Sequence, residues 1–211
     1  MSVLNKSCII RLSQYRNAII RLKTLYFVRV FSDNLADAAR VTAVQVRKDF
    51  SLFGISGKRR GGYLVDELIS QISAILGKDK VQKFIVIGIG NIGKALLHYP
   101  GFKKNEIELI AGFDIDASKY DREAKVPILP LEELSEFVKK NGIKFGIISV
   151  PDFAAQEVLE VMLRSGIKGI LNFAPICLKE PPDCVVHNLN LETELENIIY
   201  FTNFAAQAGN R

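Results

Sequence analysis

The fold is decided by one stretch of the chain, Lys83-Phe84-Ile85-Val86-Ile87-Gly88-Ile89-Gly90-Asn91-Ile92-Gly93. Its first five residues form a nearly continuous apolar run that stops at a glycine, which predicts a buried parallel strand. The next six match the pattern GxGxxG and precede a helical stretch, 94–98. A strand, a glycine turn and a helix in this order predict a site for the pyrophosphate of a dinucleotide. A tight turn without a ligand is the alternative.

The three glycines have different predicted tasks. Gly88 permits the tight turn, Gly90 lets the backbone approach the phosphates, and Gly93 lets the helix pack closely on the strand. Asp114 follows a second predicted strand, 107–113, and is expected to accept hydrogen bonds from the ribose and to repel a 2′-phosphate. This favours NAD over NADP. Asp116 is expected to cap a turn and not to touch a ligand.

Strands and helices alternate beyond this turn, with further strands at 145–150 and 169–173 and helices at 131–140 and 154–165. This order predicts an α/β fold with a doubly wound parallel sheet. Ligands on such sheets gather at the carboxyl ends of the strands. Two further strand ends are therefore expected to line the nicotinamide half of the site, with ordinary proline-stopped loops as the alternative: Ser149-Val150-Pro151 and Asn172-Phe173-Ala174-Pro175.

Charge divides the chain into two unequal halves. Residues 1–83 carry 15 Lys and Arg against 6 Asp and Glu, whereas residues 84–211 carry 13 against 17. The first half therefore has a net charge of +9 and the second a net charge of −4. This asymmetry predicts a polyanionic partner for the first half only.

Helical spacing in the basic half predicts an Arg-rich helix over 9–30, cap chemistry at Ser32 and Asp33, and a short helix over 34–39. A turn at 40–41 and a second helix opened by Thr42 complete a helix-turn-helix pattern. In that second helix three residues are expected to face inward, Val46, Phe50 and Phe53. Gln45, Lys48 and Asp49 are expected on the opposite side, with Arg47 flanking them.

A glycine-framed cationic loop, 54–63, is interpreted as the turn of a short hairpin, which forms the wing of a winged helix. A helix over 65–76 and a linker, 77–80, follow it. The start of the second helix of such a motif enters the major groove of DNA. The predicted DNA contacts are Thr42, Gln45, Arg47 and Lys48 on the helix and Lys58, Arg59 and Arg60 on the wing. The alternative for the three wing residues is that they form a solvated charge cluster without a partner.

Other classes of protein fit the sequence less well. No apolar run approaches the length of a membrane span and no signal peptide opens the chain, so a cytoplasmic protein is expected. The three cysteines, Cys8, Cys177 and Cys184, are widely spaced without a CxxC, and neither a disulfide framework nor a metal site is expected. A dehydrogenase needs a proton-transfer group. The two histidines, His98 and His187, are poor candidates, and no catalytic residue is predicted.

Taken together, the motifs of both halves closely resemble the Rex family of bacterial redox-sensing transcriptional repressors. The resemblance spans nearly the whole chain, in the segments 46–51, 53–54, 57–59, 62–63, 88–96, Tyr99-Pro100-Gly101-Phe102 and 172–175. It implies a homodimer in which NADH and NAD⁺ compete for one site, with NADH releasing operator DNA. A symmetric operator also requires a symmetric dimer.

The resemblance also assigns roles outside the motifs. It implies that the C-terminal helix is exchanged between protomers, which gives an otherwise unpaired apolar stripe over 191–204 a surface to cover it. Tyr99 and Arg11 are implied to couple the cofactor to the DNA-binding domains, and Phe173 to lie near the nicotinamide. One departure is Asn190, where the family commonly has an aspartate. The extra Arg60 in the wing is a second variable feature.

The expected organisation is a winged-helix DNA-binding domain over 1–80, a Rossmann NAD(H)-binding domain over 81–190 and a swapped helix over 191–211. The expected function is a repressor that leaves DNA when NADH replaces NAD⁺. Two alternatives remain: a small NAD-dependent oxidoreductase or CoA-binding ligase subunit, and a DNA-binding paralogue insensitive to NADH. Turnover of NADH with a carbonyl or acyl substrate would favour the first, and a DNA gel shift titrated with both forms of the cofactor separates the second from the sensor.

Overall fold

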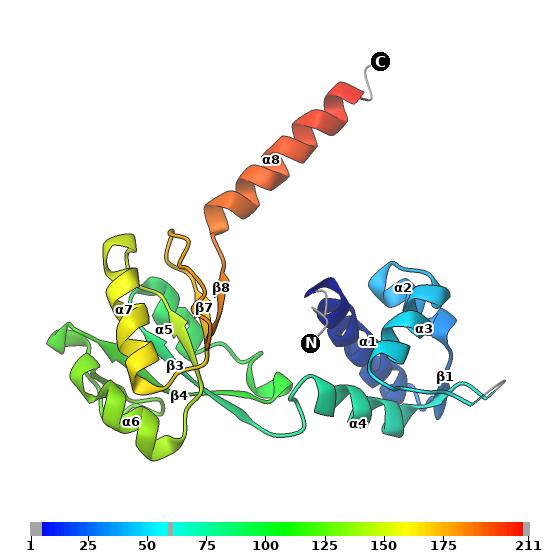
Figure 1. The fold of residues 1–211 in the computed structure, drawn as a ribbon, viewed down its shortest axis with the longest axis horizontal. Helices are drawn as coiled ribbons and strands as arrows, with labels where there is room; N and C mark the ends of the chain where they lie inside the picture. Colours follow the sequence, from blue (N-terminus) through cyan, green and yellow to red (C-terminus); the bar gives the residue numbers. More distant parts are fainter. Residues whose placement is uncertain (1–5, 59–60, 209–211) are drawn as a thin grey trace. The chain divides into compact units, whose positions relative to one another are not determined.

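The chain forms two compact units, Met1–Val81 and Gln82–Arg211. A computed structural model describes residues 6–58 and 61–208 (Figure 1). Within this part of the chain no helix has both the length and the apolar character needed to cross a bilayer. Each unit has its own hydrophobic core, so each is described separately below.

The described part of the N-terminal unit contains four helices, α1 (Lys6–Thr24), α2 (Ser32–Ala39), α3 (Ala43–Leu52) and α4 (Val65–Ile75). Two short strands, β1 (Arg29–Val30) and β2 (Tyr63–Leu64), pair antiparallel. α1 packs against α2 and α4, and α2 packs against α3. Helix-turn-helix and paired strands together give the winged-helix arrangement that the sequence predicts.

The first predicted helix is too long. α1 ends at Thr24 because the chain turns there, with Tyr26 in the left-handed region at φ 64°. After this turn, residues 29–30 are extended and pair antiparallel with β2. They therefore form a strand and not the end of a helix. The predicted cap at Ser32 and Asp33 is also wrong. Both lie inside α2, and the Asn34 side chain accepts the hydrogen bond from the Phe31 amide at 2.8 Å.

The second helix of the motif begins as predicted, since the Thr42 side chain accepts a hydrogen bond from the Gln45 amide. Val46 and Phe50 are fully buried, and Phe53 is half-buried just beyond the helix. The prediction for Asp49 is wrong, because its side chain is buried and not exposed. Asp49 lies three residues after Val46, and this spacing places it on the same inward face.

The C-terminal unit is built on a six-stranded parallel sheet. Its strands are β3 (Gln82–Ile87), β4 (Ile107–Asp114), β5 (Ile128–Pro130), β6 (Phe145–Ile148), β7 (Gly169–Asn172) and β8 (Val185–Asn188), in the spatial order β5-β4-β3-β6-β7-β8. The order reverses direction at β3, so the sheet is doubly wound as predicted. Two strands were missed, β5 and β8. Both are short edge strands, and β5 ends in a proline, which weakens the strand pattern.

Helices cover both faces of this sheet. α6 (Leu134–Asn141) and α7 (Asp152–Ser165) pack on the face that carries Ile85 and Ile87. α5 (Asn91–Leu97) packs on the other face, against Val86. β3 is therefore buried on both sides, which explains its unbroken apolar sequence. α8 (Leu191–Ala208) follows β8, and its described apolar side chains are exposed in the single chain.

Candidate functional site

The glycine turn after β3 has the geometry that its sequence predicts. Gly88 has φ 92°, and an added Cβ would lie 2.5 Å from the Ser149 carbonyl oxygen. A Cβ on Gly93 would collide with the Gly88 carbonyl oxygen. Gly90 differs, because a Cβ there would meet no atom within 4 Å. Gly88 and Gly93 are therefore required by the fold itself, whereas Gly90 leaves open space beside the backbone. Such space fits the close approach of a phosphate.

Asp114 fastens this turn to the end of β4. Its carboxylate accepts hydrogen bonds from the Ile89 amide at 2.7 Å and the Asp116 amide at 2.9 Å, and it forms an ion pair with Lys119 at 2.9 Å. Burial raises the pKa of Asp114, but these three partners outweigh burial and lower the pKa. Asp116 caps a short turn by accepting from the Ser118 amide and hydroxyl, in agreement with its prediction.

A cavity of about 390 Å³, here called the loop cavity, opens beside the turn. It brings together residues from three strand ends, including six that the sequence nominates: Gly88, Gly90, Asp114, Ser149, Val150 and Pro151. The Ser149 hydroxyl donates to the Gly88 carbonyl oxygen at 2.8 Å and so holds the turn. Apolar side chains from Ile115 and Phe153 complete the wall. The residues present fit a dinucleotide. The open backbone at Gly90 leaves room for phosphates, and the cavity beside it combines apolar walls with a few polar groups.

The other nominated residues of this unit lie outside the loop cavity. Asn172 is fully buried and donates to Asn188 Oδ1 at 2.9 Å and to the Ile176 carbonyl oxygen at 2.8 Å. Ala174 is buried, and Phe173 packs on the α5 face of the sheet. Ile89 is buried beneath the turn, and Asn91 and Ile92 open α5. Pro175 is exposed.

Tyr99, Asn190 and Arg11, which are expected to link cofactor binding to DNA binding, each contact different residues. Tyr99 lines a different cavity, of about 420 Å³, and packs edge-on against Phe102. Asn190 caps α8, because its side chain accepts from the Glu192 amide at 2.9 Å. Arg11 pairs with Asp49 inside the N-terminal unit, with Nε and Nη2 each 2.7 Å from a carboxylate oxygen.

Asp49 is the centre of a buried polar cluster beneath α3. It accepts hydrogen bonds from Arg11, from the Tyr15 hydroxyl at 2.9 Å, from Gln45 Nε2 at 2.8 Å and from the Cys8 thiol at 3.4 Å. Burial raises the pKa of Asp49, but the hydrogen bonds from Arg11, Gln45 and Tyr15 outweigh it and lower the pKa to about 2. The cluster joins α1 to α3 and includes Gln45, one of the predicted DNA contacts.

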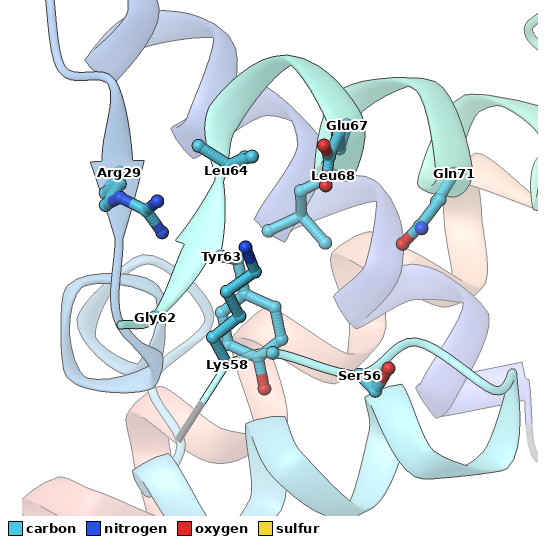
Figure 2. Close-up of a pocket in the computed structure, with 10 residues that line it drawn as sticks. Arg29, Ser56, Lys58, Gly62, Tyr63, Leu64, Glu67, Leu68 and Gln71 are labelled. Carbon is cyan, nitrogen blue, oxygen red and sulfur yellow. The ribbon is translucent and has the colours of Figure 1, made fainter. Parts of the chain in front are cut away.

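Two of the other predicted DNA contacts meet in space. Arg47 from α3 and Lys58 from the wing line one cleft of about 360 Å³, together with Tyr63 and Asp33. Lys48 is exposed on α3. Arg59 and Arg60 lie outside the described residues. Figure 2 shows the adjoining pocket, of about 210 Å³, with the side chains of Arg29 and Lys58 directed into it beside Tyr63.

Sequence reasoning missed two residues of these sites. Arg29 Nη1 donates to the Gly61 carbonyl oxygen at 2.9 Å, so it fastens β1 to the wing. Lys119 neutralises Asp114 at the rim of the loop cavity. Neither residue falls in a motif, and Arg29 was assigned to a helix. Only the pairing of β1 with β2 could have identified Arg29 as a wing residue. Among the described residues no cluster of His, Cys, Asp and Glu could hold a metal ion.

Known proteins match both units. The family model described as "Putative DNA-binding protein N-terminus" matches residues 5–51, and the one described as "CoA binding domain" matches 79–176. The redox-sensing transcriptional repressor Rex of Listeria welshimeri serovar 6b is 39% identical over 174 residues, covering 82% of this chain and 81% of that protein. The chain belongs to the Rex family.

Solved structures agree with the Rex assignment. A crystal structure of RSP in complex with beta-NAD⁺ and operator DNA has a TM-score of 0.91 and 33% identity, covering 100% of this chain and 97% of that one. RSP in complex with beta-NADH has a TM-score of 0.84 and 33% identity, covering 100% and 99%. The fold that the sequence predicts, a DNA-binding domain followed by a Rossmann-type domain, is confirmed for this Rex protein.

Proposed function

We propose that this chain is a redox-sensing transcriptional repressor that binds operator DNA through residues 1–80 and NAD⁺ or NADH through residues 81–190. One observation carries the proposal. A basic winged-helix unit and a glycine turn beside an apolar cavity occur in the same chain. The RSP structures, one with operator DNA and NAD⁺ and one with NADH, support the pairing of these two ligands.

The dinucleotide is held by this chain in the following way. Backbone amides beside Gly90 receive the pyrophosphate, because no protein atom occupies that approach. Asp114 would meet the adenosine ribose, and Val150 and Pro151 would cover the cofactor. Phe173 and its neighbours, Asn172, Ala174 and Pro175, lie toward the nicotinamide. The bound cofactor supplies the redox signal, since its nicotinamide is cationic when oxidised and neutral when reduced, and only the neutral ring accepts apolar burial without cost.

A switch requires NADH and NAD⁺ to bind the DNA-competent and DNA-incompetent states with different relative affinities, since equal affinity shifts nothing. A coupling of about 1 to 3 kcal/mol is typical of allosteric proteins. Arg11, Tyr99 and Asn190 contribute to it. Because Asn190 carries no charge, its contribution comes from capping α8 and not from an ion pair.

The repressor acts as a homodimer in the cytoplasm. α8 supports the dimer, because Leu191, Leu195 and Ile198 are each more than half exposed in the single chain. Contiguous exposed apolar patches mark protein interfaces. A second copy that exchanges residues 191–211 would cover this helix.

The relatives support a regulatory role for this chain, because the matched Rex protein is a transcriptional repressor and RSP is a Rex-family repressor. The match of residues 79–176 to a CoA-binding model favours a second ligand, because coenzyme A shares an adenine nucleotide with NAD. The RSP structures with beta-NAD⁺ and with beta-NADH favour the dinucleotide.

The deciding experiment is a gel shift of an operator duplex titrated with NADH, NAD⁺ and coenzyme A in parallel. NADH is expected to release the duplex at concentrations where NAD⁺ and coenzyme A do not. Equal retention at every NADH to NAD⁺ ratio contradicts sensing, and release by coenzyme A alone favours the second ligand.

Gly90→Val sharpens this test. The added side chain meets no protein atom near its Cβ, so the fold is expected to remain intact while the approach of the phosphates is blocked. The variant is expected to retain the duplex at all NADH concentrations, and Gly90→Ala to show a smaller loss of response. A variant that binds NADH as tightly as the wild type contradicts the assignment of this turn.

A further inference from the structure

Resting on the proposed function, we propose that Val44 reads a thymine methyl group in the operator, and that Gln45 positions the recognition helix without reading a base. The sequence pattern predicts Gln45, and not Val44, as a DNA contact. In the structure Val44 faces outward, whereas Gln45 is half-buried.

The exposed surface of α3 includes a stripe along one side of the helix, together with Leu52 in its last turn. Val44, Arg47, Lys48 and Ser51 are all exposed, and their positions are i, i+3, i+4 and i+7, which fall on one side of a helix. The buried residues Val46, Asp49 and Phe50 form the opposite face. Gln45 is half-buried and lies off the stripe.

Gln45 is also committed to a partner. Its Nε2 donates to the buried Asp49 carboxylate at 2.8 Å. The pairing that glutamine makes with adenine uses the amide nitrogen and oxygen together at one base edge. Because the Gln45 nitrogen is already bonded to Asp49, pairing with adenine would have to share or break this hydrogen bond. Gln45 is therefore a positioning residue, which joins the first turn of α3 to the cluster around Asp49.

Val44 has the opposite environment. Its side chain is 54% exposed, although it is apolar and its nearest neighbours on the stripe, Arg47 and Lys48, are cationic. Thr42 caps the helix two residues earlier, which fixes Val44 in the first turn of α3. The first turn of a recognition helix is the part that reaches base edges in the major groove. The one apolar group on those edges is the C5 methyl of thymine, and small apolar side chains contact it.

The two charged members of the stripe then have a different task. Arg47 lines the cleft shared with Lys58 of the wing, and Lys48 is free to approach phosphates or guanine edges. Val44 contributes sequence preference without charge, so its contribution does not depend on salt, unlike that of the cations.

A methyl-deletion experiment tests this assignment. The full chain with NAD⁺ first selects its preferred duplex from a random-sequence library. That duplex is then synthesised with each thymine replaced in turn by 2′-deoxyuridine, which lacks only the C5 methyl. Affinities of the wild type, Val44→Ala and the matched control Val185→Ala are measured by fluorescence anisotropy. Val185 is also apolar and exposed, but it lies on β8.

The wild type and Val185→Ala are expected to lose about fourfold in affinity at one or more thymine positions, the effect of one buried methyl group. Val44→Ala is expected to bind the original duplex more weakly by about the same factor and to show no further loss at that position. Thermal melting confirms that the variant is folded.

Two results overturn the inference: a wild type indifferent to every replacement, or a Val44→Ala variant that responds to deoxyuridine as the wild type does. If the wild type selects no duplex at all, the proposed function fails as well. The two failures are thereby distinguished.

Discussion

Each unit of this Rex protein contains a buried carboxylate, Asp49 in the first and Asp114 in the second. The two differ in the groups that donate hydrogen bonds to them. Asp49 accepts hydrogen bonds from four side chains, of which Cys8, Arg11 and Tyr15 belong to a different helix, α1. Asp114 accepts from two backbone amides and one lysine. The first therefore depends on the identity of distant residues, whereas the second depends mainly on the path of the backbone. A site built on side chains is more sensitive to substitution than one built on amides.

The largest expected effect follows from removing the first carboxylate. Asp49→Ala leaves Arg11 without its buried partner and is expected to destabilise the N-terminal unit by about 3 to 5 kcal/mol. Urea unfolding followed by circular dichroism measures this. The control is Asp66→Ala, since Asp66 pairs with Lys23 on the surface and is expected to change stability by less than about 1 kcal/mol. Equal effects of the two substitutions would remove the distinction between buried and exposed pairs.

The corresponding change in the second unit is expected to be smaller. Asp114→Asn keeps one oxygen for the Ile89 amide but loses the acceptor for the Asp116 amide and the ion pair with Lys119. We expect a loss of about 1 to 3 kcal/mol, typical of an imperfectly satisfied buried group. NADH affinity, followed by its fluorescence, should fall because the glycine turn is less firmly held. Asp116→Asn is the neighbouring control for stability, and a larger loss there would shift the anchoring role to Asp116.

The smallest expected effect is a pH dependence of stability that arises from Asp49. Its pKa is lowered to about 2 from a usual value of 3.8. A lowered folded-state pKa gives stability that is present above the unfolded value and is lost as the pH falls through the folded value. The stability difference between the wild type and Asp49→Asn should be constant above about pH 4 and shrink toward pH 2. A difference that stays constant to pH 2 would show that the charge of Asp49 is not what stabilises the unit.

The same contrast explains how far the sequence could be interpreted. Gly88 and Gly93 were predictable because a positive φ and close backbone contact leave glycine as the only choice, whatever surrounds them. Asp49 was placed on the wrong face because its charge predicts exposure. Its partners Arg11 and Tyr15 precede it by 38 and 34 residues, and no local pattern links them to it.

The sequence by itself determined the parallel sheet, the phosphate-binding turn and the basic helix-turn-helix, because glycine geometry, apolar periodicity and net charge act over short distances along the chain. Tertiary structure alone decided where α1 ends, which residues of α3 face outward, and which strand ends share the loop cavity. These depend on contacts between residues far apart in the sequence, such as β1 with β2 and α1 with α3. A side chain is assigned to a surface or a core only when the element opposite it is in place.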